Sequence, residues 1–153
     1  MSSTRQTRYI GAPRATVYRA LLDPEAVVRW MVPDDMTSEI HSFDAREGGT
    51  FRISLTYDEP TRTGKTAAHT DTHHGRFVRL EADREVVQVV EFETDDPEMQ
   101  GAMTITYRLT DAPDGGTTVT GIHEHVPPGI APADNELGWQ MAMEKLAALV
   151  EAR

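Results

Sequence analysis

Histidine residues are the first candidates for chemistry in this chain of 153 residues. His69, His73 and His74 lie close together in the sequence, with Asp71 among them. Imidazole and carboxylate groups bind a metal ion when three or four of them converge with the correct geometry. These residues lie in or beside a long polar segment, and adjacent side chains of a strand point to opposite faces. We therefore interpret these histidines as solvated, and we expect neither a metal nor a cofactor.

A second pair, His123 and His125, flanks Glu124 near the end of a β-prone segment. Both histidines alternate with Val119, so all three should share one face of a strand. If that face is buried, His123 could donate a hydrogen bond to a ligand or transfer a proton near neutral pH. The alternative is a histidine whose partners are the backbone or water.

The orientation of Glu91 and Arg79 depends on which alternate residues of their strands are buried. Glu91 would lie on the solvated face if Val90 is buried, and in the interior if the register is reversed. Arg79 has the same ambiguity, because either Phe77 or Val78 could face the core. The sequence leaves both alternatives open.

The composition excludes several classes of function. The net charge of −10 and the lack of a basic run argue against nucleic acid as a partner. The absence of cysteine excludes disulfides and thiolate chemistry, and no Gly-x-Ser-x-Gly motif is present. No apolar run is long enough to insert into a membrane, and Met1–Gln6 lacks the apolar core of a signal peptide. We expect a cytoplasmic protein.

The elements that must position these residues follow from periodicity. Pro13 suits the first turn of a helix that runs to Leu22, and Asp23-Pro24 starts a second short helix that reaches Trp30. From Thr37 onward, apolar residues alternate with polar ones, as in an antiparallel sheet with one solvated face. Predicted strands are Thr7–Ile10, Thr37–Arg46, Thr50–Tyr57, His74–Glu81, Glu85–Thr94, Met103–Thr110 and Thr117–Val126, and the segment Asp58–Thr72 is predicted to be a polar connection.

A long amphipathic helix is predicted from Asp134 to Glu151. A wide sheet with one solvated face twists and curls around such a helix. The predicted fold is therefore α+β, with a curved antiparallel sheet of seven strands around the C-terminal helix and two short helices between strands one and two. We expect one domain over residues 1–153.

Four stretches of sequence carry a resemblance to a known group of proteins. They are Ala12–Glu25, Arg29–Pro33, Phe43–Phe51 with its Arg-x-Gly-Gly turn, and Gly138–Leu146 with its Gly-Trp-x6-Leu pattern. In this order they resemble the START-like helix-grip superfamily, called SRPBCC, and in it the branch named after the activator of the heat-shock-protein-ninety ATPase. The resemblance implies the helix-grip fold. The superfamily includes lipid carriers, hormone receptors, polyketide cyclases and co-chaperone domains.

The function that we expect is binding of a small apolar or aromatic molecule between the sheet and the C-terminal helix. The predicted cavity residues are Trp30, Met31, Phe43, Phe51, Ile53, Leu55, Phe77, Met103, Ile105, Tyr107, His123, Trp139 and Met143. One alternative is a protein-interaction module that acts on a chaperone partner. Another is a cyclase or hydro-lyase with His123 or Tyr107 as the acid–base group, although no catalytic constellation is evident. The sequence is compatible with a monomer or a homodimer.

Overall fold

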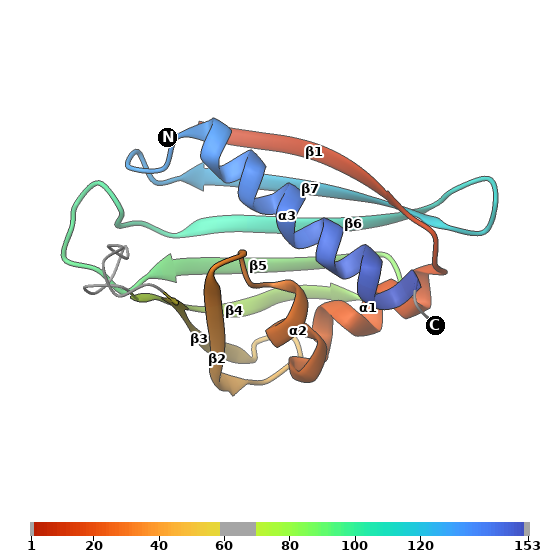
Figure 1. Ribbon diagram of the computed structural model, residues 1–153, viewed down its shortest axis with the longest axis horizontal. Coiled ribbons are helices and arrows are strands. Elements are labelled where there is room, and N and C mark those ends of the chain that lie inside the picture. The colour runs from red at the N-terminus through yellow and green to blue at the C-terminus, as the bar shows by residue number, and fades with distance from the viewer. Residues whose placement is uncertain (1, 59–69, 152–153) are drawn as a thin grey trace.

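Seven strands form one antiparallel sheet, and three helices lie on one of its faces (Figure 1). The computed structural model describes residues 2–58 and 70–151. The strands are β1 (Ser2–Ile10), β2 (Met36–Phe43), β3 (Thr50–Tyr57), β4 (Thr70–Glu81), β5 (Glu85–Phe92), β6 (Met103–Asp111) and β7 (Thr117–Val126). The helices are α1 (Arg14–Leu22), α2 (Pro24–Trp30) and α3 (Pro132–Glu151). This architecture confirms the predicted helix-grip fold.

The strand order is β1-β7-β6-β5-β4-β3-β2, so β1 and β2 form the two edges of the sheet. Alternation along β5 shows how the sequence sets the two faces. Val86, Gln88 and Val90 are buried, whereas the side chains between them are partly exposed. A residue period of two therefore directs one set of side chains towards the helices and the other towards solvent.

The two short helices form where the local sequence signals predicted them. The Asp23 side chain accepts a hydrogen bond from the Glu25 backbone N–H at 3.0 Å, and Pro24 occupies the first turn of α2. This N-cap satisfies a donor that the helix itself cannot pair. At the end of α2, the buried Trp30 indole donates to the Ala20 carbonyl at 2.9 Å, which fixes α2 against α1.

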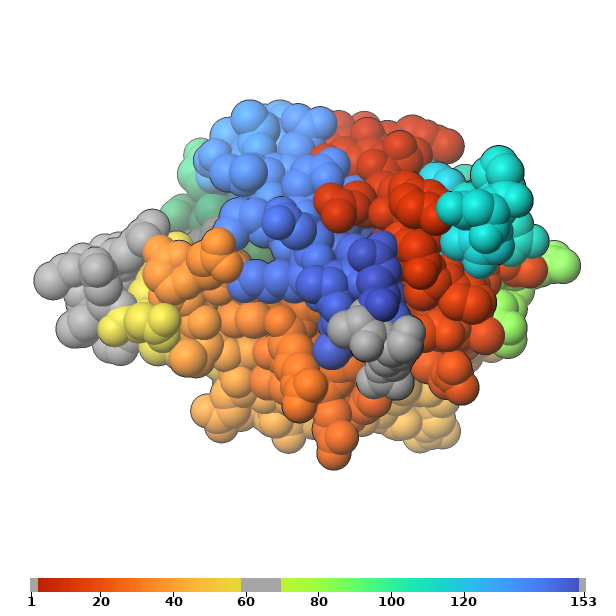
Figure 2. Space-filling view, turned by 45° about the vertical axis from the view of Figure 1, so that its right-hand side comes forward, coloured from red at the N-terminus to blue at the C-terminus, as the bar shows by residue number. Residues whose placement is uncertain are grey.

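Helix α3 crosses the inner face of the sheet diagonally (Figure 1). In the space-filling view, it lies between the N-terminal segments in red and the segment after α2 in orange (Figure 2). Gln140 Nε2 donates to Gln6 Oε1 of β1 at 2.7 Å. On the other side, Lys145 Nζ donates to the Val32 carbonyl at 2.5 Å and pairs with Asp34 at 3.0 Å. Polar contacts therefore hold α3 on both of its flanks.

Two strands begin earlier than the sequence indicates. β1 begins at Ser2 instead of Thr7, and β4 begins at Thr70 instead of His74. Both extensions are polar, so the alternation of hydrophobic residues does not predict them. They are strands because their backbones pair with the neighbouring strand. The predicted connection Asp58–Thr72 therefore ends before Thr70, where β4 begins. Residues 59–69 of this connection, including His69, lie outside the described residues.

Two β-bulges set the orientation of side chains that the sequence analysis predicted wrongly or left open. Thr4 of β1 pairs with His123, but Ser2 pairs with Val126, so β7 holds one additional residue between these pairs. His125 lies in this bulge with φ of 60° and is exposed, which corrects the prediction that it faces inward with His123. In β4, a bulge between Phe77 and Arg79 lets Phe77 face the core while Arg79 remains outside.

Candidate functional site: a cavity between α3 and the sheet

A cavity of about 280 Å³ lies between α3 and the concave face of the sheet. Its helical side consists of Trp30 and Met31 at the end of α2, Ile130 before α3, and Asp134, Asn135, Gly138, Trp139 and Ala142 of α3. Asp134 and Gly138 are exposed, which puts the mouth of the cavity near the N-terminal end of α3. The volume is near the lower end of pockets that bind small molecules, roughly 300–1,000 Å³.

The sheet side of the cavity comes from five adjacent strands. Its residues are Leu55 of β3, Asp71 and His73 of β4, Gln88, Val90 and Phe92 of β5, Met103, Ile105 and Tyr107 of β6, and His123 of β7. Most of this wall is apolar, and the polar groups are few. Binding pockets for small molecules commonly have this composition, in which apolar area supplies affinity and a few polar groups supply orientation.

His123 is the best-defined polar group of the cavity. Its side chain is 5% exposed, and its Nδ1 lies 2.6 Å from Asn135 Nδ2 of α3. The same amide nitrogen donates to Thr4 Oγ1 at 2.9 Å, so both amide hydrogens of Asn135 have acceptors. Nδ1 must then be the acceptor, which leaves the ring proton on Nε2. Burial lowers the pKa of His123 to about 4, so the ring is neutral at pH 7.

Trp139 supplies the second notable polar group. Its indole packs on β7 at Gly121, where an added Cβ would lie 2.4 Å from Nε1. Trp139 Nε1 and His123 Nε2 are both shielded from solvent, and neither has a hydrogen-bond partner among the described residues. A buried N–H without a partner costs about 1–3 kcal/mol. The two unpaired N–H groups therefore reduce the stability of the folded protein.

Three polar residues on β4 and β5 belong to the cavity although their polar character gave no indication of it. Asp71, His73 and Gln88 border the cavity and are at most 8% exposed. His73 was interpreted as solvated, and this interpretation was wrong because Thr70–His73 belongs to β4. His73 and His74 do point to opposite faces, as expected for neighbours in a strand. In residues 2–58 and 70–151, no group of three histidine, aspartate or glutamate side chains is arranged for a metal ion.

Eight of the thirteen predicted cavity residues border the cavity: Trp30, Met31, Leu55, Met103, Ile105, Tyr107, His123 and Trp139. The other five, Phe43, Phe51, Ile53, Phe77 and Met143, pack in the hydrophobic core and do not border it. The three phenylalanines form one cluster with ring centroids 5.2–6.1 Å apart. Their rings pack against one another in the filled core.

Several residues that the prediction omitted have signals in the sequence. Gln88, Val90 and Phe92 alternate along β5 with period two, so the inward orientation of one implies the inward orientation of all three. Asn135 precedes Trp139 by four residues and therefore shares its face of α3. The interior orientation of Val90 also places Glu91 on the solvated face, where its side chain is 48% exposed.

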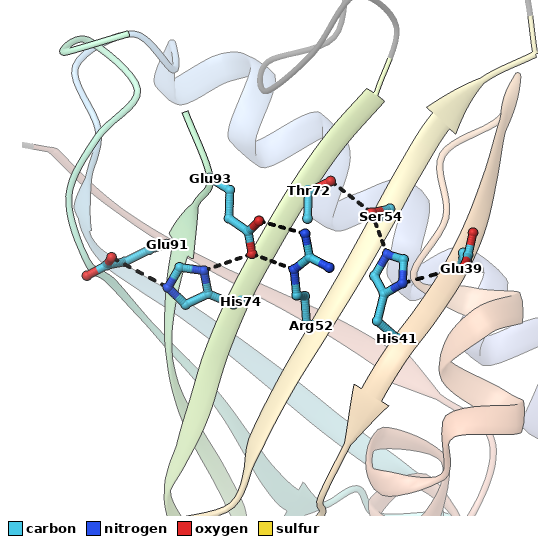
Figure 3. A network of polar contacts seen from close by, with 8 residues as sticks. All are labelled: Glu39, His41, Arg52, Ser54, Thr72, His74, Glu91 and Glu93. Atoms are coloured by element: carbon cyan, nitrogen blue, oxygen red, sulfur yellow. Dashed lines mark hydrogen bonds and ion pairs between the residues drawn. The ribbon is translucent and has the colours of Figure 1, made fainter. Parts of the chain in front are cut away.

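A polar network covers the outer face of β2 to β5, on the side of the sheet away from α3 (Figure 3). Arg52 forms a bidentate pair with Glu93, with N–O distances of 2.8 and 2.9 Å. His74 lies beside this pair, with its Nδ1 3.1 Å from Glu93. The Arg52 hydrogen bond is the main cause that lowers the pKa of Glu93 to about 2.

In the same network, Glu39, His41 and Ser54 are ordered like a hydrolytic triad. Glu39 is 3.4 Å from His41 Nδ1, and His41 Nε2 is 2.8 Å from Ser54 Oγ. However, Ser54 is only 9% exposed, its Oγ also bonds Thr72 Oγ1 at 2.8 Å, and the Glu39 side chain is 76% exposed. A nucleophile needs an accessible position and oxyanion donors nearby. We therefore interpret this network as a structural link between strands.

Glu93→Gln is expected to reduce the free energy of unfolding at pH 7 by about 1 kcal/mol or less, because the pair is partly solvated. Since the pKa of Glu93 is lowered to about 2, its contribution is present above pH 4.5 and is lost as the pH falls towards 2. Urea unfolding between pH 7 and pH 2 would measure the difference from wild type. Glu91→Gln is the matched control, because Glu91 has only a 3.7 Å contact with His74. If Glu93→Gln and Glu91→Gln reduced the free energy of unfolding equally, the ion pair of Glu93 with Arg52 would not be the source of the stabilisation.

An antiparallel sheet that curves around a long C-terminal helix, with a cavity between them, defines the helix-grip class. Within this class, the chain belongs to the family described as Activator of Hsp90 ATPase homolog 1-like protein, whose sequence profile matches residues 11–151. None of the described helices is long and apolar enough to span a lipid bilayer.

Solved structures share this fold. A protein from Chromobacterium violaceum is 30% identical with a TM-score of 0.86, and the match covers 97% of this chain and 96% of that one. The Activator of Hsp90 ATPase homolog 1-like protein from Aeromonas hydrophila is 21% identical with a TM-score of 0.74, covering 99% and 93%. A protein from Rhodobacter sphaeroides is 17% identical with a TM-score of 0.80, covering 99% and 93%, and thus shares the fold. A search of curated proteins found no match.

Proposed function

We propose that this protein binds a small, largely apolar molecule in the cavity between α3 and the sheet. The observation that supports the proposal is the cavity itself, which has mostly apolar walls and buried polar groups at defined positions. The cavity is open near the N-terminal end of α3, and its volume of about 280 Å³ is near the lower end of pockets that bind small molecules.

Catalysis receives less support from the same residues. Burial lowers the pKa of His123 to about 4, which makes its ring a weak proton acceptor at neutral pH. Burial also raises the pKa of the Tyr107 hydroxyl, so this phenol stays protonated. Neither group is tuned towards the pH at which a general acid–base residue works best.

The family's description suggests a protein-interaction module as the alternative, with activation of a chaperone ATPase as its function. Such a module would present a contiguous apolar patch on its exterior. Among the described residues, the large exposed apolar side chains are Tyr9, Val78 and Leu137, which lie on β1, β4 and α3. These dispersed side chains offer less support for docking than the cavity offers for ligand binding.

Ala142→Leu tests the proposal, because Ala142 borders the cavity from α3. The longer side chain should fill part of the cavity and weaken the binding of toluene, a small apolar probe, by about tenfold or more. Methyl-labelled methionine gives the readout by NMR. Met31 and Met103 border the cavity and should shift with toluene, whereas the buried Met99 lies elsewhere and should not.

Ala148→Leu is the matched control, since Ala148 lies on the exposed side of α3. It should leave the affinity for toluene unchanged. Native mass spectrometry of gently purified protein, before and after denaturation, would then give the mass of any ligand that co-purifies. If toluene shifts neither Met31 nor Met103 in the wild type, the cavity is not a binding site.

A further inference from the structure

Two side chains on the sheet side of the cavity carry hydrogen-bonding groups without a protein partner. Tyr107 and Gln88 border the cavity and are 5% and 4% exposed. Among the described residues, neither the Tyr107 hydroxyl nor the Gln88 amide has a hydrogen-bond partner. Burial raises the pKa of the Tyr107 hydroxyl, and no hydrogen bond contributes to the shift. Polar groups that are buried so deeply nearly always have a partner, so a ligand is the candidate to supply it.

Unlike the N–H groups of His123 and Trp139, these groups open into the cavity. In residues 2–58 and 70–151, the unpaired side-chain atoms that have no accessible surface are Ser38 Oγ, His123 Nε2 and Trp139 Nε1. The Tyr107 oxygen and the polar atoms of the Gln88 amide are not among them, so they retain accessible surface. Because both side chains project from the concave face of the sheet and border the cavity, a bound molecule can reach this surface.

The pairing of β5 with β6 brings the two groups together in the middle of the sheet (Figure 1). Gln88 pairs with Ile105, and Tyr107 lies two residues further along β6, so all three share the concave face. Such diagonal neighbours are about 7–8 Å apart, within reach of long and aromatic side chains. The Tyr107 ring also packs edge-to-face against Trp30, with ring centroids 6.2 Å apart, which restricts its position. One polar group of a ligand can therefore contact both side chains.

The hydrogens and lone pairs of these groups indicate which polar group fits. The Tyr107 hydroxyl has a hydrogen to donate, and the Gln88 amide has N–H donors and a carbonyl oxygen that accepts. The donors need an acceptor with two lone pairs, and the Gln88 carbonyl needs an N–H beside that acceptor. A carboxamide supplies both on one edge, and a glutamine pairs with such an edge through two hydrogen bonds, as it does with adenine. A ketone or an ether would leave the Gln88 carbonyl unpaired.

The charges around the cavity favour an uncharged ligand. No lysine or arginine is among the residues that border it in the described part of the chain, while Asp71 and Asp134 are acidic. A carboxylate would lose its hydration without gaining a cationic partner, which is costly. A cation has no lone pair to accept from the Tyr107 hydroxyl or the Gln88 N–H groups. A neutral carboxamide avoids both costs.

From these observations we infer that the ligand is an uncharged, largely apolar molecule that ends in a carboxamide, either primary or part of a lactam ring. The ligand carbonyl accepts hydrogen bonds from the Tyr107 hydroxyl and the Gln88 amide, and the ligand N–H donates to the Gln88 carbonyl. The apolar part contacts Ile105 and Met103. This inference rests on the proposed binding function and names the ligand class for the same cavity.

Three neutral probes of matched size and shape test the inference: benzamide, acetophenone and α-methylstyrene. They have the same number of non-hydrogen atoms, and they carry a carboxamide, a carbonyl alone and no polar group. In a purely apolar cavity α-methylstyrene would bind tightest, because it has no polar group to dehydrate. We expect benzamide to bind at least as tightly as α-methylstyrene and about fivefold tighter than acetophenone, because of its additional N–H. The methyl resonances of Met31 and Met103 report occupancy.

Two substitutions remove the polar partners one at a time. Tyr107→Phe and Gln88→Leu should each weaken the binding of benzamide by about fivefold to tenfold and change that of α-methylstyrene by less than about twofold. Tyr18→Phe is the matched control, because Tyr18 lies on α1 and does not border the cavity. Tyr107→Phe should also leave the free energy of unfolding of the ligand-free protein undiminished, since its hydroxyl has no partner to lose. A purely structural role for this hydroxyl would give the opposite result.

Two charged probes test the neutral character of the site. Benzoate and benzamidinium have the same number of non-hydrogen atoms as benzamide, and one is an anion and the other a cation. Both should bind more weakly than benzamide at pH 7. Tighter binding of either ion would overturn the uncharged class.

The outcomes separate the two proposals. Binding of benzamide that equals or exceeds that of α-methylstyrene, and that falls in Tyr107→Phe and Gln88→Leu, supports the inferred ligand class. Tighter binding of α-methylstyrene in the wild type would overturn it and leave apolar binding in the cavity intact. Unchanged affinity for benzamide in both variants would also overturn it. If no probe shifts Met31 or Met103, both proposals fail. The wild-type comparison decides these points even if the variants do not fold.

Discussion

Gly121→Ala is expected to destabilise the protein by about 3 kcal/mol, a large loss for the addition of one methyl group. A Cβ at this position would lie 2.4–2.5 Å from Nε1, Cε2 and Cζ2 of Trp139. Atoms cannot approach so closely, and Trp139 is 4% exposed between the sheet and α3. The indole must therefore leave its position, or α3 must move away from β7. The midpoint and slope of urea unfolding would measure the loss.

Gly138→Ala is the matched control for this substitution. It also replaces a glycine by alanine, but a Cβ at position 138 meets no atom within 4 Å. Gly138 lies within α3, where alanine is favoured by about 1 kcal/mol. The control should thus increase the free energy of unfolding. Opposite signs for the two substitutions would show that the packing of Trp139, and not the loss of glycine, determines the result.

A double mutant tests the cause directly. Trp139→Leu removes the three ring atoms that the new Cβ would approach. In this background, Gly121→Ala should cost less than about 1 kcal/mol, because the two residues no longer interfere. An unchanged cost of Gly121→Ala in the Trp139→Leu background would mean that the strain arises from the backbone of β7, and the contact with Trp139 would not be its origin.

The fold could be predicted from the sequence because its main signals are local. Alternation on β3, β5 and β6 and the apolar stripe of α3 follow directly from the periods of strand and helix. The N-cap at Asp23 is another local signal that the structure confirms. The polar extensions of β1 and β4 carry no such signal. Their formation depends on pairing with β7 and β3, which are distant in sequence.

The cavity could be predicted only in part, for two physical reasons. Large apolar residues such as Phe51 and Phe77 look the same in sequence whether they fill a core or line a cavity. The polar residues of the cavity break the apolar alternation, so Asp71 and His73 resembled a solvated segment. The bulge at His125 depends on the register between β1 and β7, and no single strand contains that information.

His123 should make the protein sensitive to mild acid, with a loss on the order of 3 kcal/mol between pH 7 and pH 4. Its pKa is lowered by burial to about 4 in the folded protein, against 6.5 for an ordinary histidine. Below pH 6.5 the unfolded chain takes up a proton that the folded protein excludes. Stability from the neutral ring is therefore complete above pH 6.5 and is lost progressively as the pH falls to about 4. The loss of stability from His123 thus occurs at higher pH than the loss from Glu93, which begins only when the pH falls below about 4.5.

The measurement is urea unfolding of the wild type, His123→Gln and His125→Gln at pH 7, 5.5 and 4. Glutamine at position 123 does not titrate, so this variant should lose less stability than the wild type over the same range. His125 is exposed in the bulge of β7, so His125→Gln should retain the wild-type slope. The two histidines lie two residues apart, which makes the comparison a test of burial alone. If His123→Gln loses as much stability in acid as the wild type, the His123 ring is not held neutral by its buried position, and its assignment as a neutral donor would have to be abandoned.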